Sequence, residues 1–223
     1  MKRIRVVTMA CLFAVFWVCS AESAVVDLVE YAFNVDGAIS NNSAPGSVNL
    51  AAFDTATGLG MITVTMVGTG THYVGLFVDH EIDAATNTSF NEYGSTSGAP
   101  AAGLSWEIDE PGGDIYTNFS AGSLDGTNGV LPSLPDDVSM ALGWNFALAA
   151  DETAIMEFLF NVTAPAGGFY LSQVDPNSEY TLYFNSTLEI QGGEIPVPEP
   201  STMLLLGSGL VGLVGYGRRR MKT

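Results

Sequence analysis

Apolar and polar residues alternate with a period of two along several short segments of this chain. Residues 61–67 interleave threonines with apolar residues in this way, which is typical of a β-strand with one buried face. In residues 180–190 the main apolar positions are all even-numbered, so they lie on one face of a strand. We expect that face to point toward a core, as in an antiparallel sheet. These positions are Leu182, Phe184, Leu188 and Ile190.

Further runs of apolar, β-branched and aromatic residues are bounded by turn-forming residues. They cover residues 73–78, 138–148, 153–162 and 168–174, with shorter candidate strands at 104–108 and 114–119. Between about residues 79 and 135, Gly, Ser, Asn, Asp and Pro dominate, which predicts long loops or hairpins. The crossover helices of an α/β fold are missing. The pattern therefore predicts an all-β domain over residues 25–195, an antiparallel β-sandwich or jelly-roll-like fold.

The first 24 residues have the order of a secretory signal peptide: a basic start, an apolar helix-forming stretch at residues 6–18, then small residues. The basic residues are Lys2, Arg3 and Arg5. Cleavage after Ala21, Ser23 or Ala24 fits the small residues. An uncleaved anchor is the alternative, although the apolar stretch is short for a membrane span.

The C-terminal segment, residues 196–223, has three parts in order. Its first part is a stiff motif, Pro198, Glu199 and Pro200. Residues 201–217 follow without a charge and are rich in Leu and Gly, which predicts a minimal transmembrane helix. The basic tail 218–223 contains Arg218, Arg219 and Arg220, which the positive-inside rule keeps on the cytoplasmic side.

This ordered combination resembles the PEP-CTERM sorting signal. The resemblance implies that exosortase, a membrane-embedded transpeptidase, processes the tail near residues 198–200. It also implies export through Sec-type machinery, an inner-membrane-anchored precursor held by the C-terminal helix, and delivery to the cell surface or extracellular matrix of a Gram-negative bacterium. The alternative is an ordinary C-terminal anchor that stays in place.

Charge is distributed very unevenly along the chain. All seven Lys and Arg residues lie in the two terminal segments, and residues 6–217 carry all 24 Asp and Glu residues. Such a domain repels phosphates, which excludes nucleic acid as a partner. The mutual repulsion of its carboxylates also suggests that a divalent cation such as Ca²⁺ binds and reduces that repulsion. The alternative is an acidic surface without a bound cation. Both cysteines, Cys11 and Cys19, lie in the signal segment, so the domain has no disulfide.

The densest polar cluster contains Asp79, Glu81 and Asp83. Period-two spacing puts them on one face of a strand, or lets them converge on Ca²⁺ in a loop. The alternative is a solvated strand end. The segment is not an EF-hand, because Ala84 follows Asp83 where the Ca²⁺ loop needs Gly.

A second acidic group could in principle supply the paired carboxylates of a glycosidase. It consists of Glu107, Asp109, Glu110 and Asp114. Trp106 and Tyr116 are candidates for stacking against sugars, with burial in the core as the alternative.

No nucleophile, phosphate-loop, dinucleotide or zinc-protease motif occurs in the chain. The domain has two histidines and no Cys, Lys or Arg, so it lacks the side chains on which most catalytic sites depend. We therefore expect no catalytic residues and a non-enzymatic role in adhesion, matrix structure or association with extracellular polysaccharide. The alternative is a metal-dependent hydrolase acting on that polysaccharide.

Overall fold

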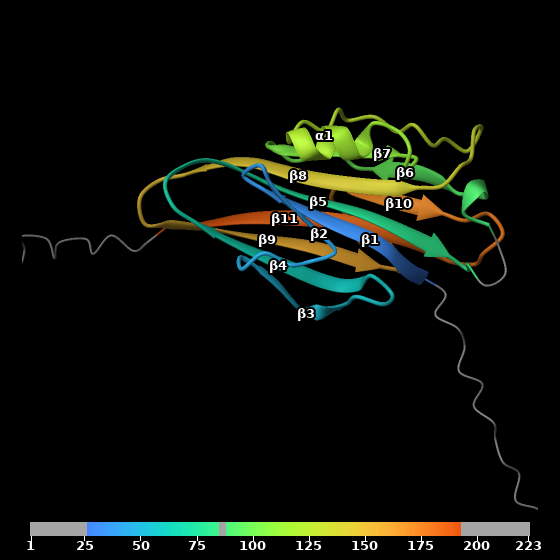
Figure 1. Cartoon of the computed structure of the whole chain (residues 1–223), viewed down its shortest axis with the longest axis horizontal. Helices are drawn as coiled ribbons and strands as arrows, with labels where there is room; N and C mark the ends of the chain where they lie inside the picture. The colour runs from blue at the N-terminus through green and yellow to red at the C-terminus, as the bar shows by residue number, and fades with distance from the viewer. Residues whose placement is uncertain (1–25, 85–87, 193–223) are drawn as a thin grey trace, which may run out of the picture.

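The computed structural model describes residues 26–84 and 88–192, which form two antiparallel sheets packed face to face as a β-sandwich (Figure 1). The five-stranded sheet has the order β2-β1-β5-β8-β7. Its strands are β1 (Val26–Val35), β2 (Ala38–Asn41), β5 (Gly70–Ile82), β7 (Leu104–Asp109) and β8 (Ser139–Leu148).

The six-stranded sheet has the order β3-β4-β9-β11-β10-β6. Its strands are β3 (Val48–Asp54), β4 (Leu59–Val67), β6 (Tyr93–Ser97), β9 (Glu152–Asn161), β10 (Tyr170–Val174) and β11 (Thr181–Gly192). The prediction of an all-β sandwich is confirmed. Seven of the strands coincide with segments expected from the sequence, and β5 extends its predicted segment at both ends.

Alternate residues of the facing strands fill the space between the sheets. Val74, Leu76 and Val78 of β5 are fully buried there, as are Phe158 and Phe160 of β9. The ring of Phe160 stacks on that of Phe184 from β11 with centroids 4.2 Å apart. This packing explains why the period-two pattern was readable in the sequence: each strand buries one face only.

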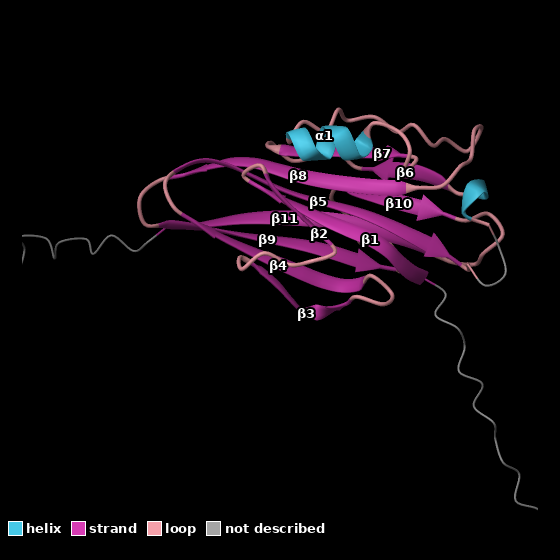
Figure 2. Cartoon of the chain, viewed as in Figure 1, coloured by secondary structure: helices cyan, strands magenta, loops and turns pink. Residues whose placement is uncertain are grey.

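A short helix, α1 (Ile115–Ala121), covers part of the outer face of the five-stranded sheet (Figure 2). The prediction of a strand at residues 114–119 is therefore wrong. Ile115 and Phe119 are four residues apart and share one face of the helix, where both are fully buried in a cluster with Phe77. Gly122 ends the helix with a left-handed φ of 68°. Tertiary packing thus overrides the strand propensity of these residues.

The described chain begins and ends at opposite ends of the sandwich. Val26 is paired with Ile82, at the end of β5. Gly192 is paired with Glu152, next to the β8–β9 hairpin, and this hairpin lies beside Gly70 at the start of β5. Twelve residue steps along β5 separate the two ends by about 40 Å. We call them the Val26 end and the Gly192 end.

The predicted signal peptide and transmembrane helix fall in residues 1–25 and 193–223, outside the described residues. Within residues 26–84 and 88–192, no helix combines the length and the apolar character that crossing a membrane requires.

Candidate functional site

Carboxylates gather on the outer face of the five-stranded sheet at the Val26 end. Asp79 and Glu81 alternate with the inward-facing Val78 and His80 of β5, so both point outward. Asp83 lies beyond the end of β5 and has a left-handed φ of 57°, so it does not continue the register of the strand.

Neighbouring strands add acidic residues that the sequence pattern did not single out. The register places Glu30 of β1 directly opposite Asp79, and Asp27 opposite Glu81. Asp137 lies two residues before Ser139, which is paired with Asp79, so it belongs beside Glu81. Like charges in such cross-strand positions destabilise a sheet. We call this group of five the outer carboxylates.

Three of the outer carboxylates, Asp79, Glu81 and Asp137, have a pKa above that of an ordinary carboxyl group. The pKa of Asp79 is raised from 3.8 to about 7, mainly by burial, with the charges of Asp137 and Glu30 adding to the rise and the hydroxyl of Ser139 opposing it. That hydroxyl donates a hydrogen bond to Oδ1 of Asp79 at 3.3 Å. Burial and the charge of Asp137 also raise the pKa of Glu81. At neutral pH this face therefore carries less negative charge than its composition implies.

A tighter group of carboxylates lies beside α1. Among the described residues, Glu107, Asp114 and Asp125 form a group whose carboxylate oxygens all lie within 4.8 Å of one another. Glu107 comes from β7 and is fully buried, whereas the other two are exposed. Oxygen ligands at this spacing suit a hard cation such as Ca²⁺.

Glu107 is held by two hydrogen bonds. Nδ2 of Asn118 donates to Oε1 at 3.0 Å, and the backbone N–H of Asp125 donates to Oε2 at 3.2 Å. Burial raises the pKa of Glu107, and the charges of Asp125 and Asp114 add to the effect. The sequence pattern did not single out Asp125, because its contact with Glu107 of β7 joins a loop to a strand and leaves no local pattern.

The other two members of the predicted second acidic group lie nearby but outside the tight group. Asp109 accepts a hydrogen bond from the backbone N–H of Asp114 at 3.0 Å. Glu110 lines a separate hollow with Asp136.

The two candidate aromatic residues for sugar stacking lie in different clusters. Trp106 faces the space between the sheets, where its ring lies 5.8 Å from that of Phe169. Tyr116 lies on α1 against Phe77, and its hydroxyl donates to Oδ1 of Asn41 at 2.7 Å. The structure does not bring the two rings together into one platform.

A buried polar network joins the two sheets at the Val26 end. Nε2 of Gln173 donates to the backbone oxygen of His80 at 2.7 Å and also contacts Oε2 of Glu92. Burial raises the pKa of Glu92 to about 8 and lowers that of His80 to about 4, so both side chains are mainly neutral at pH 7. Fully buried and neutral, these groups are suited to holding the sheets together rather than to binding a solute.

Residues 196–220 match the PEP-CTERM protein-sorting motif. Neither the curated proteins nor the solved structures gave a match. The matched segment contains the motif Pro198, Glu199 and Pro200 together with Arg218, Arg219 and Arg220, all outside the described residues.

Proposed function

We propose that this chain, a PEP-CTERM sorting domain-containing protein that is exported, anchored and then processed by exosortase, works as a non-catalytic protein of the cell surface or extracellular matrix. The observation that carries the proposal is the sorting motif at residues 196–220, directly after a sandwich that holds no Lys or Arg. In this proposal residues 1–24 are the signal peptide read by Sec-type machinery. Residues 201–217 are the temporary transmembrane helix of a Gram-negative inner membrane.

The geometry of the sandwich supports a role in presentation. The last described residue, Gly192, lies shortly before the motif residue Pro198, so the attachment point is at the Gly192 end. The opposite end carries the outer carboxylates, about 40 Å away along β5. A tethered domain of this kind displays its acidic end toward the surroundings, where adhesion or association with extracellular polysaccharide takes place.

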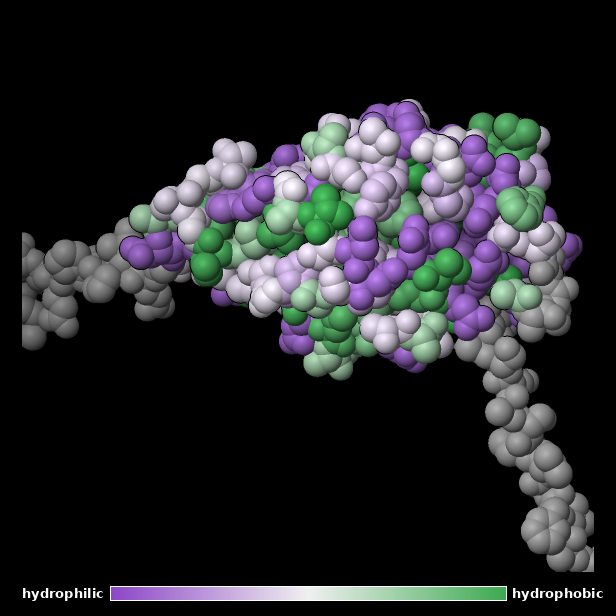
Figure 3. Space-filling view, viewed as in Figure 1, coloured by the Kyte–Doolittle hydropathy of each residue, from purple (hydrophilic) through white to green (hydrophobic). Residues whose placement is uncertain are grey.

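The surface chemistry favours neutral or cationic partners. With no Lys or Arg in residues 6–217, the domain has no groups that replace the counterions of a polyanion. Hydrophilic and hydrophobic residues are interspersed on the face shown in Figure 3, and carboxylates form its charged part. Neutral polysaccharide, or polysaccharide bridged through Ca²⁺, is therefore the partner that this surface fits.

The proposal is tested by following the tail in cells. The full chain is expressed with and without exosortase, and its C-terminus is identified by mass spectrometry of surface material. We expect the basic tail 218–223 to be absent only when exosortase is present, and Glu199→Ala to retain it. An intact tail in surface material of exosortase-containing cells would contradict the processing. Binding of the processed protein to a polysaccharide array then tests the association, with bare support as the control.

The tight group Glu107, Asp114 and Asp125 favours a second candidate, a metal-dependent hydrolase acting on extracellular polysaccharide. This candidate requires the release of reducing ends on addition of Ca²⁺, and the loss of that release in Glu107→Gln. Absence of release with several divalent cations would leave the non-catalytic role as the better account.

A further inference from the structure

The central strand β11 has a free edge over its second half. β9 pairs with β11 from Tyr183 to Gly192, whereas β10 pairs with it only from Thr181 to Asn185. Among the described residues, Ser186 to Gly192 therefore have no neighbouring strand on the β10 side. Figure 1 shows β11 and β8 running on toward the Gly192 end past β10 and β7. We call residues 186–192 the free edge.

Such an edge leaves backbone N–H and C=O groups ready to pair with another strand. Within the free edge Ser186 and Leu188 continue the inward-facing parity of Phe184, and Thr187 and Glu189 point outward. Ile190, also on the inward-facing side, is 42% exposed and has a strand neighbour on its β9 side only. An added strand would therefore bury apolar surface as well as satisfy the backbone.

A cavity of about 330 Å³ opens at the start of the free edge, where β10 begins. Trp144 forms part of its wall and donates a hydrogen bond from Nε1 to Oγ of Ser186 at 2.8 Å. The lining contains no charged side chain. It consists of Ala99, Ala101, Leu104, Trp144, Gly168, Phe169, Ser186, Thr187 and Leu188. We call it the Trp144 pocket.

We propose that the free edge binds an extended peptide segment of a partner protein, which adds a strand to the six-stranded sheet and places an apolar side chain in the Trp144 pocket. Backbone pairing supplies affinity in this mode, and pockets for alternate side chains supply specificity. The position opposite Glu189 selects a Lys or Arg in the peptide, because opposite charges attract across strands.

Charge complementarity argues for a partner other than a second copy of this chain. A two-fold pairing that uses the whole free edge is centred on Glu189 and sets Glu189 against itself, which is repulsive. No Lys or Arg exists in residues 6–217 to relieve it. The tail after Gly192 is a poor occupant too, because Pro196, Pro198 and Pro200 lack the N–H groups that a ladder needs.

The test uses the isotopically labelled full chain in detergent micelles and two synthetic heptapeptides. One peptide alternates valine with lysine and the other alternates valine with glutamate. We expect the lysine peptide to shift the amide resonances of residues 186–192 and to slow their hydrogen exchange. The glutamate peptide should leave them unchanged. Shifts spread over the whole acidic surface, or no shifts at all, would overturn the proposal.

A charge reversal sharpens the test. Glu189→Arg should weaken binding of the lysine peptide about fivefold or more and allow the glutamate peptide to bind. The matched control is Glu157→Arg on β9, which is exposed on the same sheet face but one strand away from the edge. The control should change the affinity less than twofold. Equal losses in the two variants would show attraction by net charge only and would contradict the free edge as the binding site.

A variant that fills the Trp144 pocket distinguishes peptide binding at the free edge from non-specific adhesion to the surface. Ala99 is exposed at the rim, so Ala99→Trp should occupy the pocket with little change in the melting temperature. We expect this variant to lose the lysine peptide. Retained binding would overturn the assignment of the Trp144 pocket.

Discussion

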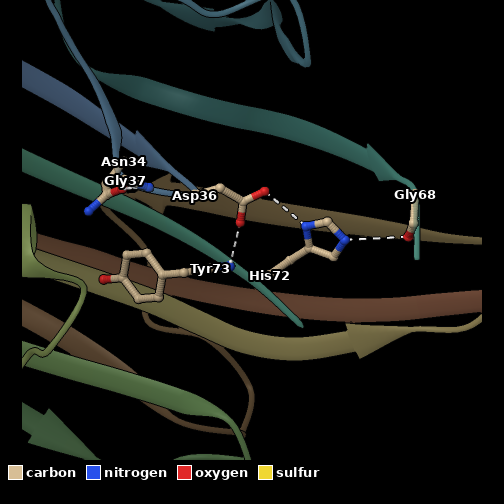
Figure 4. Close-up of polar contacts among 6 residues, drawn as sticks. All are labelled: Asn34, Asp36, Gly37, Gly68, His72 and Tyr73. Carbon is tan, nitrogen blue, oxygen red and sulfur yellow. Dashed lines mark hydrogen bonds and ion pairs between the residues drawn. The ribbon is translucent and has the colours of Figure 1, made fainter. Parts of the chain in front are cut away.

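Nδ1 of His72 lies 2.9 Å from Oδ2 of Asp36, and this contact is the ion pair that the described residues form when His72 is protonated (Figure 4). Oδ1 of Asp36 accepts a second hydrogen bond, from the backbone N–H of Tyr73 at 2.8 Å. Nε2 of His72 lies 3.3 Å from the backbone oxygen of Gly68. The pair therefore ties the β1–β2 hairpin to the start of β5 at the Gly192 end.

This pair gives the fold a pH dependence of known sign. The hydrogen bond to Asp36 raises the pKa of His72 above 6.5. Its contribution is thus complete below pH 6.5 and disappears as the pH rises through the raised pKa. Asp36 is 42% exposed, so water limits the contribution to about 1 kcal/mol or less. His72→Gln should lower the free energy of unfolding by more at pH 5.5 than at pH 8.5, measured with urea. An equal loss at both values would contradict this role.

Asp79→Asn should stabilise the protein at alkaline pH. Because the pKa of Asp79 is raised to about 7, its carboxyl group favours folding while protonated and loses that contribution as the pH rises from about 4 through 7. The amide keeps an acceptor for Ser139 and removes the charge facing Glu30. We expect a gain of roughly 1–3 kcal/mol at pH 8.5 and a distinctly smaller gain at pH 5, from urea unfolding.

A control separates this local effect from net charge. Asp151 is exposed in the β8–β9 turn at a φ of 66°, a conformation that Asn adopts readily. Asp151→Asn removes one charge at the other end of the sandwich and should change stability by less than about 0.5 kcal/mol. A gain equal to that of Asp79→Asn would point to overall repulsion.

Calcium should raise the melting temperature. At the affinities of extracellular Ca²⁺ modules, 5 mM Ca²⁺ stabilises a bound domain by about 1–2 kcal/mol, or roughly 4 °C. Loss of the rise in Glu107→Gln assigns the site to Glu107, Asp114 and Asp125. Loss in Glu81→Gln assigns it to the group predicted from the sequence, Asp79, Glu81 and Asp83. NaCl at equal ionic strength is the control, and an equal rise with NaCl would contradict specific binding.

Gly58→Ala should destabilise the turn between β3 and β4. The residue has a φ of +66°, and an added Cβ would lie 2.0 Å from Nε2 of the buried His80. Left-handed strain and the displaced ring together predict a loss of about 2–4 kcal/mol in urea unfolding. Gly112→Ala, at a site with no atom within 4 Å of the added Cβ, is the control and should cost far less. Equal losses would contradict the clash with His80.

The strands were predictable because burial of one face leaves a local signal. Leu182 and Phe184 are fully buried, as their parity predicts, and Leu188 on the same parity is half-buried. The burial pattern weakens after Asn185, where β11 loses its neighbour β10, and Ile190 on the same side is exposed. Helix α1 escaped prediction because Phe77, which it covers, comes from a distant strand.

The sites were less predictable, because they depend on register and loop contacts. The spacing of Asp79 and Glu81 was visible in the sequence, but Glu30 faces Asp79 only through the pairing of β1 with β5. A bulge between Leu28 and Glu30 shifts that pairing by one residue, and no sequence pattern predicts the bulge. Likewise Asp125 reaches Glu107 only because the loop that follows α1 folds back onto β7.

The opposed positions of Val26 and Gly192 determine how the domain responds to mechanical load. A pull between the tail and the far end acts along the axis of β11, so the strand would have to slide past β9. The ten cross-strand pairs between these strands are then loaded together in shear rather than opened one after another. A protein held by its tail while its distant end binds a moving matrix would thus resist extension with one of its two longest ladders.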